Sequence, residues 1–222
     1  MTKKEDITYE GYDKHLIRKN VTKDINEKHK KDKTTSYLDF YGAGESYKYI
    51  SKRTKANILS IDNNPKIAKR FKNNIQTRFI SLKNLCIEAL RKFNIMWLDY
   101  CGTLNDSVEE ELSLLPRIMR NKGTLYITLR MGREHDYFKG TSRSRIEREI
   151  ITTICHHLAK NNIKATWKYT VKYKSIAKTK GKRKCKAPTA MKLYKFTWIR
   201  VKTKTFNIPI IKDEFKLVTE MN

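Results

Sequence analysis

The feature that most constrains this sequence is a regular alternation of short apolar runs with segments of helix length, which begins near Thr34. Such alternation is typical of βαβ units, in which parallel strands are joined by crossover helices. The last two apolar runs differ, because only the lysine-rich segment 175–190 separates them, and this favours antiparallel neighbours. The sequence therefore predicts an α/β fold with helices on both faces of a mostly parallel, seven-stranded sheet that ends in an antiparallel hairpin.

The individual elements follow from local signals. Asn64 followed by Pro65 predicts a helix start, Asp106 is expected to cap a helix over 107–120, and the segment 121–123 is expected to turn the chain into the fifth strand. Period-two alternation places the aromatic and apolar residues of 167–173 on one face of the sixth strand. The expected strands are 37–41, 57–61, 78–81, 95–98, 124–130, 165–174 and 193–202.

The length of 222 residues suits one domain with appendages. Residues 1–33 mix ten basic and seven acidic residues with few large apolar ones, which indicates a surface helix or arm. We expect the domain to span 34–204, with 175–190 as an insertion in the hairpin and 205–222 as a tail. No apolar run approaches the roughly 18 residues of a membrane span, so a soluble, intracellular protein, cytoplasmic or nuclear, without a membrane partner is expected.

The charge and the cysteines limit the class of partner. A formal net charge of +26 makes a polyanion, and nucleic acid before other polyanions, the leading expectation. The four cysteines have no paired short spacing and the five histidines complete no zinc pattern with them, so no structural metal is expected.

The first candidate site is the loop Asp39-Phe40-Tyr41-Gly42-Ala43-Gly44 after the first strand. Paired glycines allow a tight turn and a close approach of the backbone to a ligand. The third glycine of the dinucleotide fingerprint is missing, which disfavours NAD and FAD. About 20 residues on, at the end of the next strand, Asp62 offers a carboxylate to both hydroxyls of a ribose.

The second candidate site follows the fourth strand, in Trp97-Leu98-Asp99-Tyr100-Cys101-Gly102. Here an acid and an aromatic ring meet at the carboxyl edge of the sheet, where chemistry is expected. Asp99 and Tyr100 are the predicted catalytic residues. Cys101 is expected to be a packed small residue and not a nucleophile.

In this order the pieces resemble the class I, Rossmann-like S-adenosylmethionine-dependent methyltransferases. The segment 38–46 resembles the family's glycine-rich first motif, 61–62 its acidic second motif, 97–102 its fourth motif, and 115–128 its leucine-proline and glycine strand signature. The resemblance implies S-adenosylmethionine as cofactor. The residues that it places around this cofactor are Asp39, Tyr41, Gly42, Gly44, Asp62, Asn63, Asn84 and Asp99.

The acceptor is less closely defined. Asp99 and Tyr100 resemble the acid and ring with which amino-nitrogen methyltransferases hold a flipped base, although the two prolines of their motif are absent. Residues 99–103 are loosely similar to a stretch of tRNA guanine-N2 dimethyltransferases, which favours an exocyclic amine. Ribose 2′-O methyltransferases use a Lys-Asp-Lys-Glu tetrad, and Thr128 occupies the position of one lysine, which disfavours that reaction.

The half of the chain from Ile150 to Lys212 contains seventeen Lys and Arg residues and no Asp or Glu. Such a surface can neutralise several phosphates, so it is expected to position a nucleic acid without reading its sequence. The residues expected to bind the nucleic acid are Lys172, Lys174, Lys178, Lys180, Lys182, Arg183, Lys184 and Lys186.

Together these patterns predict a nucleic-acid methyltransferase, with RNA favoured over DNA because no target-recognition domain is visible. Two alternatives stay open. One is a catalytically inactive methyltransferase fold that serves as a nucleic-acid-binding or partner subunit, and the other is a protein methyltransferase that acts on an acidic partner.

Overall fold

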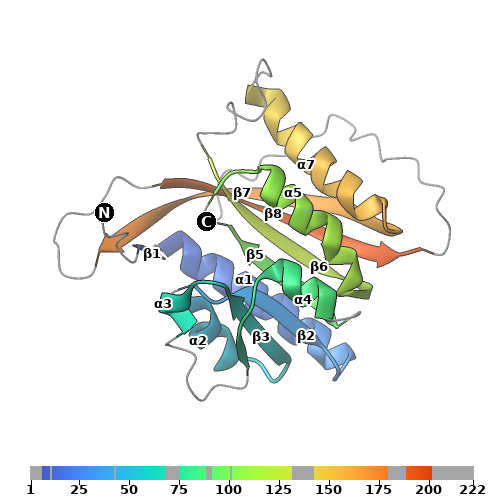
Figure 1. Ribbon diagram of the computed structural model, residues 1–222. Coiled ribbons are helices and arrows are strands. Elements are labelled where there is room, and N and C mark those ends of the chain that lie inside the picture. The colour runs from blue at the N-terminus through green and yellow to red at the C-terminus, as the bar shows by residue number, and fades with distance from the viewer. Residues whose placement is uncertain are drawn as a thin grey trace.

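The computed structural model describes residues 7–10, 12–42, 44–68, 76–88, 92–100, 102–131, 143–179 and 189–201. Its centre is an eight-stranded sheet with the order β1-β7-β8-β6-β5-β2-β3-β4 (Figure 1). Five neighbouring strands, β6, β5, β2, β3 and β4, are parallel to one another, whereas β8 is antiparallel to both β6 and β7. The predicted mostly parallel sheet with a closing antiparallel hairpin is therefore confirmed.

All seven predicted strands are present, and an eighth was not foreseen. This is β1, which pairs antiparallel with the far end of β7. The bounds of the strands are β1 Ile7–Glu10, β2 Ser36–Phe40, β3 Asn57–Asp62, β4 Thr77–Phe79, β5 Phe93–Asp99, β6 Met119–Arg130, β7 Ile163–Thr179 and β8 Thr189–Arg200.

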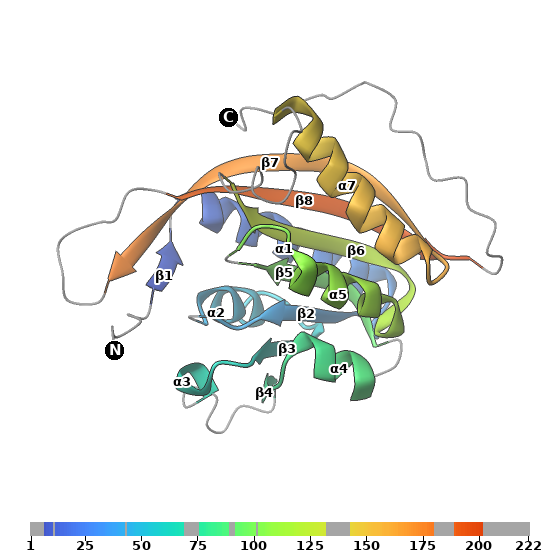
Figure 2. The ribbon, with the colours of Figure 1, turned by 45° about the horizontal axis from the view of Figure 1, so that its top comes forward.

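Helices cover both faces of the sheet, as predicted (Figure 2). One face carries α1 (Tyr12–Lys31) and α2 (Glu45–Ser51), and the other carries α4 (Leu82–Glu88), α5 (Asp106–Leu114) and α7 (Arg143–Ala159). The short helix α3 (Pro65–Ala68) follows β3, and a 3-10 turn (Leu115–Arg117) follows α5. No helix in the described ranges is both long and apolar enough to cross a membrane.

The two faces have separate cores. On the α7 face, Ile154 and Leu158 of α7 pack with Leu98, Ile127 and Phe196 of the sheet. On the α1 face, the buried residues of the helix pack with residues of the same strands that point the other way, Tyr37, Ile95, Trp97 and Tyr126. Because side chains alternate between the two faces along a strand, the central strands contribute to both cores, as expected for strands that are buried on both sides.

The N-terminal segment contributes more side chains to the core than its composition indicated. Ile17, Val21 and Ile25 of α1 are at most 1 % exposed and form part of the core of the α1 face. The prediction that 1–33 stays outside the core is therefore wrong for this side of the helix. Three apolar residues at helical spacing suffice to dock it, although charged residues surround them.

Two local predictions are wrong around the fifth helix and the strand that follows it. The cap of α5 is Asn105, whose side chain accepts a hydrogen bond from Val108 N at 3.0 Å, and not Asp106. The segment 121–123 lies inside β6 and does not form a turn. A Cβ atom on Gly123 would lie 2.1 Å from the Asn94 carbonyl oxygen and 2.3 Å from the Trp198 ring, so close packing, not a turn, requires glycine here. In contrast, Asn64 accepts from Lys66 N at 3.0 Å and begins α3 as predicted.

The expected common face of 167–173 is interrupted by a bulge in β7. The register with β8 shifts between Trp167 and Tyr169. As a result, Trp167 packs on the α7 face, whereas Val171 and Tyr173 pack on the α1 face. One additional residue in a strand reverses the side on which later residues lie, and sequence alternation alone does not reveal this.

Candidate active site

The predicted site residues gather where three neighbouring parallel strands end. β2 lies between β3 and β5, and Asp39 is in register with Ser60 on one side and Trp97 on the other. The carboxyl ends of these strands therefore present the loop after Phe40, the loop after Asp62 and the loop after Asp99 at one edge of the sheet. Ligands of open α/β sheets bind at such an edge.

The glycine loop has the backbone conformation that its sequence predicted. Gly42 and Gly44 have φ angles of 50° and 79°, a region that favours glycine. A Cβ atom on Gly44 would lie 2.7 Å from the Tyr41 ring, which folds back over this residue. A Cβ atom on Gly42 would meet nothing within 4 Å. The open side of the loop is therefore at Gly42.

Asp62 faces this open side, as the sequence analysis expected of a ribose ligand. One carboxylate oxygen accepts from Gly42 N at 3.0 Å and the other from Asn64 N at 2.8 Å. Burial raises the pKa of Asp62, and these backbone hydrogen bonds partly offset the effect. Two backbone bonds fix the carboxylate while each oxygen keeps a further lone pair with which to accept.

Asp39 is held in a different way and is 1 % exposed. The Ser60 hydroxyl donates to one carboxylate oxygen, and the Tyr37 hydroxyl donates to the other at 3.3 Å. Burial raises the pKa of Asp39 to about 7, against the lowering effect of the two hydrogen bonds. The Asp39 side chain is therefore buried near the end of β2, with a protein hydroxyl bonded to each of its carboxylate oxygens.

The structure adds a residue that sequence reasoning missed. Lys14, in the first turns of α1, places its Nζ atom 2.5 Å from the Asp99 carboxylate, and the two side chains are 11 % and 18 % exposed. One turn further along α1, Arg18 donates to the Ser46 hydroxyl at 3.2 Å, next to the glycine loop. The signal for Lys14 was the helical spacing of 14, 17, 18, 21 and 25, which places the lysine on the same side as the docking residues.

The two predicted catalytic residues lie on opposite faces of the sheet. Asp99 points to the α1 face, where Lys14 contacts it. Tyr100 points to the α7 face, where its hydroxyl donates to Glu111 at 2.8 Å and its ring packs edge-on against Phe40 at 5.2 Å. Burial and Glu111 hold the pKa of Tyr100 well above its ordinary value. The structure thus does not bring the acid and the ring together as one acceptor clamp.

The remaining predicted cofactor residues lie at the rim. Asn63 and Asn84 are exposed. Asn84 is in the first turn of α4, and its backbone N–H donates to the Ser81 hydroxyl at 3.1 Å, so Ser81 caps this helix. Cys101 and Ala43 lie outside the described residues.

Thr128, which stands where a 2′-O tetrad would have a lysine, is buried and in register with Asp99. Its hydroxyl accepts from the Trp97 indole at 3.0 Å. This position therefore helps to order the sheet beside Asp99 and supplies no cation.

Of the predicted nucleic-acid-binding residues, Lys172 is exposed on β7. Lys174 and Lys178 belong to β7, and the backbone of Lys178 is in register with Thr8 of β1. Lys180, Lys182, Arg183, Lys184 and Lys186 lie outside the described residues. In the described part of the chain, no three His, Cys, Asp or Glu side chains come close enough to hold a metal ion.

The residues at this edge fit S-adenosylmethionine. Gly42 leaves open space where a ligand approaches, and Asp62 presents its carboxylate beside that space. The edge therefore combines a glycine loop, a ribose-type carboxylate and a second acid, Asp99, with a lysine counterion.

Comparison with known proteins agrees with this geometry at the level of the fold. No protein-family model matches the sequence, and no curated protein matches it significantly. Among solved structures, Trm1 from Pyrococcus horikoshii, in complex with S-adenosyl-L-methionine, superposes with a TM-score of 0.65 at 14 % identity over 90 % of this chain. The fold is a Rossmann-like methyltransferase fold.

Other structures support the same assignment of fold. TYW2 from M. jannaschii, in complex with AdoMet, has a TM-score of 0.54 at 14 % identity, with 90 % of each chain covered. The plantazolicin methyltransferase BpumL, in complex with a substrate analogue and SAH, has a TM-score of 0.52 at 14 % identity, with 84 % of this chain and 85 % of that chain covered. A putative transferase from Pyrococcus horikoshii has a TM-score of 0.55 at 11 % identity, with 83 % of this chain covered. The present chain spans 58 % of the length of Trm1 and 62 % of the length of this transferase.

Proposed function

We propose that this chain is an S-adenosylmethionine-dependent methyltransferase that acts on nucleic acid, with RNA preferred over DNA, at an exocyclic base nitrogen. The observation that carries the proposal is the meeting, at one edge of a methyltransferase fold, of the Gly42–Asp62 pair and the Lys14–Asp99 pair. The first pair suits the ribose of the cofactor. The second places a fixed carboxylate where the acceptor would be held.

S-adenosylmethionine, when bound, supplies a methyl group on a cationic sulfur that departs as a neutral thioether. The chain's own task is then mainly to position the acceptor. In the proposed complex the Asp99 carboxylate accepts a hydrogen bond from the amine N–H, and its ion pair with Lys14 holds the carboxylate in place. The acceptor nitrogen would lose one proton on methylation, and the Asp99 carboxylate or water would take up this proton.

The charge of the chain supports nucleic acid as the substrate class. A net charge of +26 exceeds what solubility needs, and the acid-free half from 150 to 212 suits a polyphosphate. Tyr100 is not part of the proposed acceptor site, because Phe40 and Glu111 hold its ring on the face of the sheet opposite to Asp99.

A second candidate, transfer to a ribose 2′-oxygen, gains support from one observation. The Lys14–Asp99 pair provides one lysine and the acid of a Lys-Asp-Lys-Glu tetrad. Thr128 provides no second lysine, so the exocyclic nitrogen stays the leading proposal.

Methylation assays with labelled cofactor distinguish these reactions. Unmodified total RNA and DNA are incubated with the protein, digested and analysed by nucleoside mass spectrometry. We expect label in RNA, on a base, and a loss of at least a hundredfold in Asp99→Ala, in line with the effect of removing a positioned catalytic group. Glu88→Gln, which changes an exposed acid paired with Arg78, is the matched control and should keep full activity.

Label on ribose would favour the second candidate. A folded protein that binds nucleic acid and transfers no methyl group to it would contradict the proposal and favour the inactive subunit. Transfer only to an acidic protein, with no competition by RNA, would favour a protein methyltransferase.

A further inference from the structure

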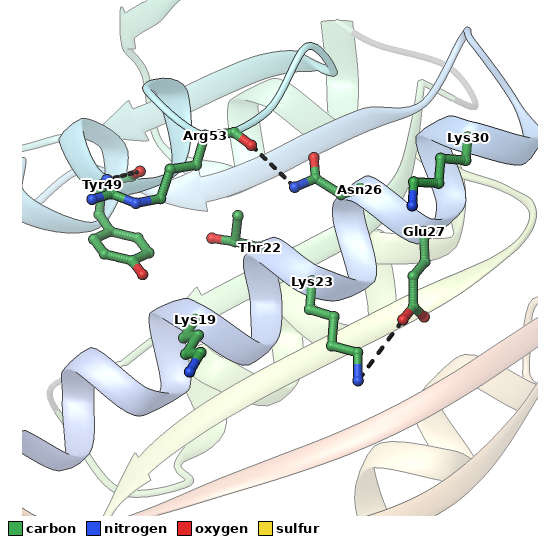
Figure 3. Close-up of a pocket in the computed structure, with 8 residues that line it drawn as sticks. All are labelled: Lys19, Thr22, Lys23, Asn26, Glu27, Lys30, Tyr49 and Arg53. Atoms are coloured by element: carbon green, nitrogen blue, oxygen red, sulfur yellow. Dashed lines mark hydrogen bonds and ion pairs between the residues drawn. The ribbon is translucent and has the colours of Figure 1, made fainter.

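A basic groove lies between α1 and α2 (Figure 3). We name it the α1–α2 groove. Its lining residues are Lys19, Thr22, Lys23, Asn26, Glu27, Lys30, Tyr49 and Arg53. We propose that this groove binds the phosphodiester backbone of a single-stranded nucleic acid and leads it toward Asp99. The inference rests on the proposed function, because it assigns a path to the same substrate.

The charges in the groove suit a polyanion. Four cations face one anion, Glu27, and Glu27 contacts only one of them, Lys23, at 3.9 Å in an exposed pair. Among the described residues, neither Lys19 nor Lys30 forms an ion pair within 4 Å. Both side chains are exposed, so they are available to phosphates.

The spacing of these cations suits an extended strand. Lys19 and Lys30 are eleven residues apart on one helix, which corresponds to about 16 Å along its axis. A stacked strand advances about 3.4 Å per phosphate, so the groove can accompany about five nucleotides.

The far wall of the groove provides a flat surface of the kind on which bases stack. The Arg53 guanidinium lies 4.0 Å from the centre of the Tyr49 ring and donates to the Tyr49 carbonyl at 3.0 Å. Asn26 of α1 donates to the Arg53 carbonyl at 3.0 Å, which ties this wall to the helix (Figure 3). Tyrosine rings and arginine planes are common stacking partners of unpaired bases.

The position of α1 connects the groove to the candidate active site. Lys14 contacts Asp99 at the carboxyl edge of the sheet, whereas Lys28 Nζ lies 3.4 Å from the Lys122 carbonyl, near the start of β6. The helix therefore crosses the sheet from the site to the opposite edge. Lys19 lies five residues after Lys14, or about 7.5 Å along the helix, so the groove begins about one and a half turns from Lys14.

The test is fluorescence anisotropy with end-labelled single-stranded RNA and with DNA of the same sequence, at several salt concentrations. Lys19→Gln/Lys30→Gln removes two exposed cations of the groove. Lys92→Gln/Arg117→Gln removes two exposed cations that lie outside both the groove and the acid-free half 150–212, and it is the matched control. Circular dichroism confirms the fold of each variant.

We expect the groove variant to weaken binding and to reduce the slope of log K against log salt by about 1.4, which is about 0.7 for each lost phosphate contact. The control variant should keep the wild-type slope. In addition, Glu27→Gln should tighten binding, because it removes the one anion of the groove, while Glu110→Gln, an exposed acid on α5, should not.

Equal slopes for the groove variant and the control would overturn the inference, and so would an unchanged affinity for Glu27→Gln. If wild type methylates nucleic acid while the groove variant binds like the control, only the groove assignment fails. If wild type binds neither RNA nor DNA, the nucleic-acid part of the proposed function fails with it. Tighter binding of RNA than of DNA would identify the 2′-hydroxyl as an additional contact.

Discussion

The two faces of the central sheet differ in the side chains that the covering helices bury against them. Among the described residues, α4, α5 and α7 close the α7 face over a large apolar core, which is accompanied by one buried ion pair, Lys192–Glu147 at 3.1 Å. The α1 face is closed by a helix that buries charges together with its apolar residues: Lys14 contacts Asp99, and Lys195 contacts Asp24 at 2.6 Å. The Tyr126 hydroxyl also donates to Asp24, and burial beside this acid raises the pKa of Tyr126.

This difference indicates a division of roles. Apolar packing stabilises a fold without preferring a ligand, whereas buried ion pairs add little net stability and are retained where chemistry or specificity needs them. In this protein the Lys14–Asp99 pair, the glycine loop and the basic groove all lie on or beside the α1 face, whereas the buried Lys192–Glu147 pair lies on the α7 face, away from the glycine loop. We therefore expect mutations on the α7 face to change stability and mutations on the α1 face to change function.

The largest expected effect is on stability, from Ile154→Ala in α7. Ile154 is fully buried among apolar residues, and its truncation leaves a cavity. The free energy of unfolding should fall by about 2–5 kcal/mol in urea denaturation. Cofactor affinity, measured where the variant is still folded, should not change. A large loss of cofactor affinity in the folded variant would contradict the assignment of stability to the α7 face and of function to the α1 face.

A smaller loss of stability, with loss of activity, is expected from Lys14→Met. The Asp99 carboxylate then remains largely buried without its counterion, which should cost about 1–3 kcal/mol. The double variant Lys14→Met/Asp99→Leu removes both charges and should recover most of this stability, but not methyl transfer. Wild-type activity in Lys14→Met would contradict the role given to the pair.

Some features of the fold and of the candidate site could be predicted from the sequence, and others could not. The seven predicted strands with their closing hairpin, the helix at Pro65, the glycine conformations and the facing of Asp62 to the loop followed from local patterns. The Lys14–Asp99 pair joins residues that are 85 positions apart, and in the N-terminal segment the helical spacing of three apolar residues was a weaker signal than the many charges around them.

The bulge in β7 was equally hidden, because an extra residue leaves no mark in an alternating run of aromatics and lysines. Tyr100 was assigned correctly to the end of the fourth predicted strand, yet adjacent residues of a strand point to opposite faces. Sequence proximity to Asp99 therefore did not mean proximity of side chains.

The smallest expected effect is a change in pH dependence, from Asp39→Asn. Because burial raises the pKa of Asp39 from its ordinary value of 3.8 to about 7 in the fold, the folded state binds the proton more tightly, so this contribution to stability is lost as pH rises through 7. Wild type should lose roughly 1 kcal/mol between about pH 6 and 8, and Asp39→Asn should lose less. Denaturation at both pH values measures this, and parallel curves would exclude Asp39 as the source.

Isothermal titration with S-adenosylmethionine tests the central claim most directly. Wild type should bind the cofactor, and Asp62→Ala should bind it much more weakly while nucleic-acid affinity is unchanged, because Asp62 lies beside the open side of the glycine loop and away from the basic groove. Absence of heat with S-adenosylmethionine and with its demethylated product, in a protein whose fold is intact, would contradict the assignment of this edge as a methyltransferase site.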